Sequence, residues 1–187
     1  MAAVSIGLES IISRVKLDPE KMGYRIISRE NYEVIKEPGI APHSKLDLSV
    51  YRLDQKYTFA FPGVSGITKW FDQWELDSYM QPLVVSGLIL SALRGSQTLL
   101  EGLVIAFPIK SGMYVSDYFH FVAKEGNHEA KERNYIASIV PFEQYRGSYK
   151  LPELLVPCHI DAKDIQLLGG VSLKASDGVQ ILFSKQV

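Results

Sequence analysis

The chain has 187 residues, of which 47% are apolar and 22% are charged. This composition is typical of a globular protein and argues against intrinsic disorder. A chain of this length buries roughly 70% of the surface of its unfolded state, so it needs no metal or disulfide to fold. Twenty basic and twenty-one acidic residues give a formal charge of -1, which lacks the positive excess typical of nucleic-acid-binding proteins.

The single cysteine, Cys158, excludes an intrachain disulfide. Because it follows Pro157 in an apolar stretch, we expect a small buried side chain in a reducing compartment. No signal peptide is predicted at the N-terminus. The most apolar segment, Leu83 to Leu93, is about half as long as a membrane span.

Residues 4–15 predict a short amphipathic helix, because apolar side chains recur there at helical spacing. These apolar positions are the candidate self-association residues, Val4, Leu8, Ile11, Ile12 and Val15. Three roles stay open for the helix: packing on the chain's own body, docking on a neighbouring copy, and resting on a membrane surface.

Two β-prone runs, Tyr24 to Ser28 and Tyr32 to Lys36, predict a small hairpin. The next segment, Glu37 to Ser44, holds two prolines and a glycine and predicts an extended surface connection. We therefore predict a boundary between an N-terminal arm and linker, residues 1–44, and a globular domain, residues 45–187.

The predicted globular domain opens with two strands, residues 46–51 and 57–61, joined by a turn at Asp54-Gln55. A helix is predicted over 64–77, with Trp70 and Trp74 on one stripe that most simply faces the core. The helix predicted over 80–94 has little polar face and should be largely buried. A central strand is predicted from Leu99 to Phe107.

The second half of the chain predicts β-structure only. The expected strands cover residues 113–123, 135–140, 154–160, 165–174 and 179–183, with a hairpin turn at 176–178. A charged loop is predicted at 125–133 and a tyrosine-bearing loop at 144–151. The predicted fold class is α+β, a mostly antiparallel sheet packed by two central helices, with an N-terminal amphipathic helical arm.

The tyrosine-bearing loop is a candidate partner-binding site. It carries arginine and tyrosine, which are favoured in interfaces, on a connection between strands. The candidate partner-binding residues are Tyr145, Arg146, Tyr149 and Lys150. An ordinary surface loop is the simpler interpretation and stays open.

No catalytic or metal-binding motif is complete. His128 to Glu132 begins like a zinc-protease helix, but Glu132 stands where the second histidine is required. Gly169-Gly170 lies in a strand pattern without the lysine of a phosphate loop, which predicts a bulge or a close backbone contact. We therefore expect no enzyme, no metal and no cofactor, although a site built from distant strands stays open.

Three segments resemble the core of rhabdovirus matrix proteins, particularly those of plant-infecting members. They are the aromatic strand region Lys45 to Phe61, the helical Lys69-Trp70-Phe71-Asp72, and the apolar helix Gln81 to Ser96, which ends in Gly-Ser. Strands follow from Leu99, as they do in that family. Unlike the animal-virus members, residues 1–44 carry neither a lysine-rich cluster nor a proline-rich budding motif.

The resemblance implies a non-enzymatic viral structural protein that self-associates, condenses the nucleocapsid and links it to the envelope. The implied partners are further copies of the chain (a homo-oligomer) and the viral nucleocapsid of nucleoprotein and RNA. The inner membrane leaflet and the tail of an envelope glycoprotein are further candidates. The implied location is the virion and the host-cell cytoplasm, with membrane or nuclear association left open.

Two other functions stay open. One is binding of a small apolar ligand in a pocket lined by the aromatics of Met113 to Phe121. The other is RNA binding by a viral accessory protein, for which affinity should fall steeply with added salt. Its candidate contacts are Arg133, Arg146, Lys150 and Lys174.

Overall fold

The computed structural model describes residues 4–46, 55–72, 99–123, 125–175 and 179–187. The helices are α1 (Leu8–Ile12), α2 (Arg29–Ile35), α3 (Gly63–Asp72), α5 (Phe119–Val122) and α6 (His128–Ser138). The strands are β1 (Val4–Ile6), β2 (Met22–Ile27), β3 (Ser44–Leu46), β4 (Gln55–Pro62), β5 (Leu99–Pro108), β6 (Tyr114–Asp117), β7 (Val140–Pro141), β8 (Pro152–Val156), β9 (Gln166–Ala175) and β10 (Val179–Ser184).

These strands join into one sheet in the order β1-β10-β9-β5-β2-β4-β8-β6-β7, with β3 paired to β4. Among the described strands, β1 and β10 pair in parallel, and the other pairs are antiparallel. The prediction of an α+β fold with a mostly antiparallel sheet is therefore confirmed. The predicted central strand is also confirmed, since β5 lies between β9 and β2.

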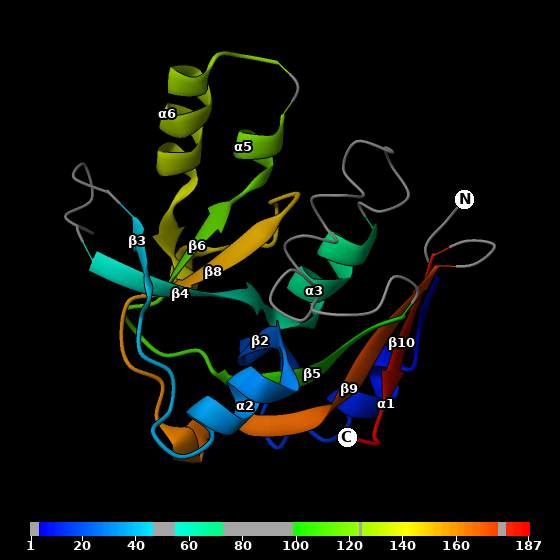
Figure 1. The fold of residues 1–187 in the computed structure, drawn as a ribbon. Helices are drawn as coiled ribbons and strands as arrows, with labels where there is room; N and C mark the ends of the chain where they lie inside the picture. Colours follow the sequence, from blue (N-terminus) through cyan, green and yellow to red (C-terminus); the bar gives the residue numbers. More distant parts are fainter. Residues whose placement is uncertain (1–3, 47–54, 73–98, 124, 176–178) are drawn as a thin grey trace.

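Strand β4 connects the two parts of this sheet. Its middle residues, Thr58 to Ala60, pair with β8, whereas Phe61 and Pro62 at its end pair with β2. In Figure 1, β2, β5 and β9 lie on one side of β4, and β8 and β6 lie on the other. Because one continuous strand belongs to both parts, neither part has a complete sheet without it.

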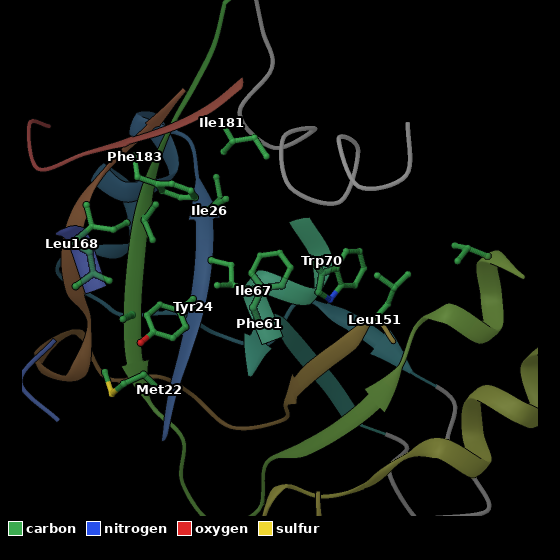
Figure 2. Packing of buried hydrophobic residues seen from close by; sticks show 14 residues of the cluster. Met22, Tyr24, Ile26, Phe61, Ile67, Trp70, Leu151, Leu168, Ile181 and Phe183 are labelled. Atoms are coloured by element: carbon green, nitrogen blue, oxygen red, sulfur yellow. The ribbon is translucent and has the colours of Figure 1, made fainter. Parts of the chain in front are cut away.

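The core lies on both faces of the sheet. Side chains alternate along a strand, so Tyr24 and Ile26 of β2 enter one cluster while Ile27 enters another. Figure 2 shows the first cluster, in which Phe61 of β4 and Trp70 of α3 lie together.

Trp70 fixes α3 to the sheet. It is 2% exposed, and its indole Nε1 donates to the Pro152 carbonyl on β8 at 2.7 Å. Its ring meets those of Phe59 and Phe61 edge-on, at centroid distances of 6.0 and 5.6 Å. Trp70 is thus a core residue, as predicted, whereas Trp74 lies outside the described residues.

The N-terminal predictions need two corrections. Residues 4–15 are not one helix, because β1 precedes α1 and Gly7 separates them with a positive φ of 85°. The predicted second strand of the hairpin, from Tyr32 to Lys36, is instead part of α2. The Oγ of Ser28 accepts from the Asn31 N–H at 3.0 Å, and this cap starts a helix where β-propensity favoured a strand.

The predicted domain boundary at residue 44 is also wrong. Strand β2 comes from the predicted arm, yet it lies in the middle of the sheet between β5 and β4. The connection after α2 is tied down as well, since Ile40 exchanges backbone hydrogen bonds with Ile160 at 2.9 Å. Residues 4–44 therefore belong to the same body as the rest of the described chain.

The all-β prediction for the second half fails in two places. The predicted strand 113–123 is β6 followed by the short helix α5, and most of residues 125–140 form α6. Asn127 starts α6 by accepting from the Ala130 N–H at 2.9 Å. The charged residues after it are good helix formers, so an N-cap and local propensity explain the difference.

Several predicted elements are confirmed: the returning strand as β4, the first central helix as α3, and the last strands as β8, β9 and β10. The bulge or close backbone contact predicted at Gly169-Gly170 is confirmed too. Leu168 has no partner in the pairing of β5 with β9, because Val104 pairs with Gly169 and Ile105 with Leu167, which is a bulge. A Cβ on Gly169 would lie 2.2 Å from the Ser184 carbonyl oxygen, which is a close backbone contact. The helix predicted over 80–94, the turn at 176–178 and residues 47–51 of the first strand lie outside the described residues.

Candidate self-association surface

The N-terminal segment is anchored to the sheet at its centre. Ile11 of α1 is fully buried in the core cluster that also holds Leu168 and Phe183. Nη1 of Arg14 donates to the Leu168 carbonyl at 2.7 Å, and Nε2 of Gln166 donates to the Arg14 carbonyl at 2.6 Å. Ile11 is therefore a core residue and is excluded from the predicted contact with a partner.

An open groove runs beside α1. Apolar residues from the N-terminal segment form one wall, and Val64 and Thr68 of α3 form the other. The apolar residues on the first wall are Ile6, Leu8, Ile12, Val15 and Leu17. Ile6 is 48% exposed and Leu17 is 57% exposed, which is unusual for large aliphatic side chains.

The predicted self-association residues thus separate into three groups. Leu8, Ile12 and Val15 line the groove and pack against the core from outside. Ile11 lies beneath them in the core. The backbone of Val4 pairs with Gln180 in β10. Sequence reasoning missed Ile6 and Leu17, which it did not include in the helical stripe.

Strand β1 forms one end of the sheet. Its described neighbour is β10, which it meets in parallel from Val4↔Gln180 to Ile6↔Leu182. No described strand pairs with its other side. An edge of this kind presents N–H and C=O groups that a further strand can use. The groove and the open edge share Ile6, so they form one continuous surface.

The predicted partner-binding loop is held by hydrogen bonds between its backbone and the side chains of Asp117 and Lys69. The carboxylate of Asp117 accepts from the Lys150 N–H at 3.2 Å and the Leu151 N–H at 2.9 Å. Nζ of Lys69 donates to the carbonyls of Gly147 and Tyr149. These hydrogen bonds attach the loop to β6 and α3.

Two of the four loop candidates are largely used in packing. Tyr145 and Tyr149 pack against the second core cluster, with ring centroids 5.0 Å apart. Arg146 is exposed, and its guanidinium donates to the Glu143 carbonyl at 2.7 Å. Lys150 is exposed and places Nζ 4.3 Å from the Phe119 ring centroid.

Helix α3 contacts both predicted sites. Val64 and Thr68 line the groove beside α1, while Lys69 holds the tyrosine-bearing loop. A partner seated in the groove would therefore lie against the helix that also positions the loop.

The other sequence candidates do not form a site. Within the described ranges, histidine, cysteine and carboxylate side chains form no group of three that would hold a metal ion. Cys158 was expected to be buried and is exposed, because β8 ends at Val156 and the chain then leaves the sheet. Among the aromatics proposed to line a ligand pocket, Tyr118 and Phe119 pack against the first core cluster. Tyr114 and Phe121 pack against a smaller cluster formed by Tyr135, Ile139 and Leu155.

The sequence analysis missed the burial of ionisable groups on two strands. Glu153 of β8 is 5% exposed, and Nη1 of Arg25 on β2 is buried without a hydrogen-bond partner. Each lies in an apolar strand pattern, and no local motif marks it.

A scan of the chain against models of known protein families gave no match, and a comparison with curated proteins gave none either. No helix among the described residues has both the length and the apolar character needed to cross a bilayer.

Proposed function

We propose that this chain is a non-enzymatic structural protein that assembles with copies of itself, as the rhabdovirus matrix proteins that it resembles do. The observation that carries the proposal is the meeting of an apolar groove and an open sheet edge at Ile6. The occupant of this surface is a second copy of the same chain.

Two properties favour a second copy over another partner. An open edge strand can pair antiparallel with the same strand of another copy across a twofold axis, which satisfies both edges at once. The formal charge of -1 adds little repulsion between copies. Because β1 spans three residues, the backbone contributes few hydrogen bonds, and Ile6, Leu17 and the groove must contribute most of the affinity.

The wider matrix role adds the viral nucleocapsid as a second partner, with a membrane leaflet or glycoprotein tail beyond it. This step is supported by the resemblance of three sequence segments, of which Lys69-Trp70-Phe71-Asp72 lies on α3. Arg146 and Lys150 are exposed on the loop that α3 holds, so they are the proposed contacts for the nucleocapsid.

The test is sedimentation velocity of the purified chain over a concentration series, at low and high salt. We compare the wild type with Leu17→Glu, which places a charge on the groove. Val34→Glu is the matched control, because Val34 is 69% exposed on α2 and lines no part of the groove. Burying an unpaired charge costs more than about 1.4 kcal/mol, which corresponds to tenfold in affinity.

We expect the wild type and Val34→Glu to form oligomers with the same concentration dependence, and Leu17→Glu to need at least about ten times more protein. Circular dichroism checks that all three are folded. A wild type that stays monomeric at every concentration contradicts the proposal, and so does equal association of Leu17→Glu. Deleting residues 1–22 is not a usable test, because it removes Ile11 from the core.

A further inference from the structure

Glu153 is a carboxylic acid enclosed between the sheet and α6. Its side chain is buried at a position on β8 that pairs with Ser116 on β6. The hydroxyl of Tyr135, on α6, donates to Oε1 of Glu153 at 2.8 Å. Oγ of Ser116 in turn donates to the Tyr135 hydroxyl at 3.2 Å.

The groups that face Glu153 carry hydroxyls. Tyr135 faces it from α6, Tyr57 from β4 and Tyr118 from the turn between β6 and α5. In the described part of the chain, no lysine, arginine or histidine forms an ion pair with it. Burial raises the pKa of Glu153 from 4.5 to about 7, and the hydrogen bonds from Tyr135 and Ser116 act in the opposite direction.

Helix α6 depends on the same contact for its attachment. The helix is polar, and its buried residues are Tyr135 and Ser138. The Tyr135 ring packs on Phe121 of α5 with centroids 4.3 Å apart. Figure 1 shows α6 beside α5, standing above β6 and β8 at one end of the molecule. The apolar attachment of the helix is one small cluster, in which Tyr135 and Ile136 pack with Leu155, so detachment of α6 opens this cluster without opening the two larger ones.

We propose that Glu153 is a proton-operated latch for α6: the helix stays docked while the carboxyl holds its proton and detaches more often once the carboxyl is ionised. In the docked state a negative charge at Glu153 has no compensating cation among the described residues. Detachment of α6 lets water reach the carboxylate and removes the cost of burying the charge.

The sign of the pH effect follows from the two states. With α6 detached, water restores the ordinary pKa of Glu153, 4.5, whereas in the docked state it is about 7. Below the lower value the carboxyl is protonated in both states, so pH has no effect. Between the two values the detached state loses its proton first, and detachment rises about tenfold per pH unit. Above the higher value both states are ionised and the rise ends.

The latch is tested by amide hydrogen exchange of α6 in the full-length protein between about pH 4 and pH 8, corrected for the intrinsic exchange rate. We expect the opening constant of α6 to rise roughly 40-fold between about pH 5 and pH 7 in the wild type. In Glu153→Gln, which keeps the shape and cannot ionise, it should not change. Amides of β5, in the centre of the sheet, serve as the internal reference.

Two further variants separate the latch from other causes. Tyr135→Phe removes a hydrogen bond that favours the ionised carboxylate, so the pH at which opening levels off should move upward. Histidine also changes charge near neutral pH, and α5 and α6 carry His120 and His128. The double variant His120→Asn, His128→Asn should keep the wild-type response.

A flat wild-type profile overturns the latch, and so does a Glu153→Gln profile as steep as that of the wild type. If Glu153→Gln does not fold, Tyr135→Phe decides alone, because an unchanged levelling pH overturns the assignment to Glu153. The result does not depend on self-association, since the exchange is measured on the protein at concentrations where it sediments as one species.

Discussion

The guanidinium of Arg25 is buried against the sheet, and one of its nitrogens has no hydrogen-bond partner. It lies on β2 opposite Ile105 of β5, on the same face as the buried Ile27. Its Nη1 is buried and makes no hydrogen bond. Burial lowers the pKa of Arg25 to about 10, so the group is still charged at neutral pH. Burial and this positive charge together lower the pKa of His43.

Replacing Arg25 should therefore stabilise the protein. Arg25→Met keeps most of the length of the side chain and removes a buried donor that has no acceptor. We expect the free energy of unfolding to rise by about 1–3 kcal/mol, measured by urea denaturation. Arg14→Met is the matched control, because the Arg14 guanidinium donates to the Leu168 and Lys185 carbonyls and its loss should destabilise.

The opposite result for Arg25→Met would be informative. A loss of stability would mean that the guanidinium binds an anion in solution, and added phosphate should then stabilise the wild type more than the variant. Equal stability of the two proteins would mean that water reaches Nη1 often enough to solvate it.

At the scale of one element, the junction of β1 and α1 depends on Gly7. The residue has a φ of 85°, and a Cβ there would lie 2.4 Å from the Phe183 carbonyl oxygen on β10. Both facts exclude an ordinary side chain. The close approach is what allows β1 to pair with β10 while α1 turns back to place Ile11 in the core.

Gly7→Ala should lower the free energy of unfolding by more than the cost of an alanine in a left-handed backbone conformation. Gly147 is the matched control, because it has a φ of 78° and no atom within 4 Å of an added Cβ. Gly147→Ala should cost about 1–2 kcal/mol of unfolding free energy, and Gly7→Ala should cost clearly more because the chain must also move away from β10. Urea denaturation compares the two, and equal costs would show that the junction adapts without loss.

Sequence patterns correctly predicted the elements in which apolar residues recur at the spacing of a strand or a helix. Alternation found β4, and helical spacing found α3 with Ile67 and Trp70 buried. The patterns failed where one local hydrogen bond decides the structure. The caps at Ser28 and Asn127 start α2 and α6 in stretches that looked like a strand and a loop.

The candidate site shows the same limit at longer range. The apolar stripe of the N-terminal segment correctly placed Leu8, Ile12 and Val15 near a surface, but only the position of β9 and β10 decides that Ile11 is covered. Likewise, Glu153 differs from an exposed strand glutamate only because α6 packs over it through Tyr135. Such burial depends on residues far apart in sequence, which no local pattern contains.

For the whole molecule, the decisive feature is the shared strand β4. Its pairing with β8 and β2 joins the two parts of the sheet, and Phe61 sits at the change of partner, 2% exposed. Its ring lies 5.6 Å from Trp70, which is hydrogen-bonded to Pro152 on β8. Loss of this ring should destabilise both parts of the sheet together, since α3 packs against β2 and β8 at this point.

Phe61→Ala should therefore lower the free energy of unfolding by about 3–5 kcal/mol in a single transition. We would follow urea unfolding by tryptophan fluorescence, which reports on the α3 region, and by hydrogen exchange of β8 and β9, one strand from each side of β4. Coincident midpoints in the variant as in the wild type indicate one cooperative unit.

Val34→Ala is the control for Phe61→Ala. Val34 is exposed on α2, so this substitution should change the free energy of unfolding by less than about 0.5 kcal/mol. If β8 loses protection at lower urea than β9 in Phe61→Ala, the two parts fold separately and β4 is only a mechanical link between them.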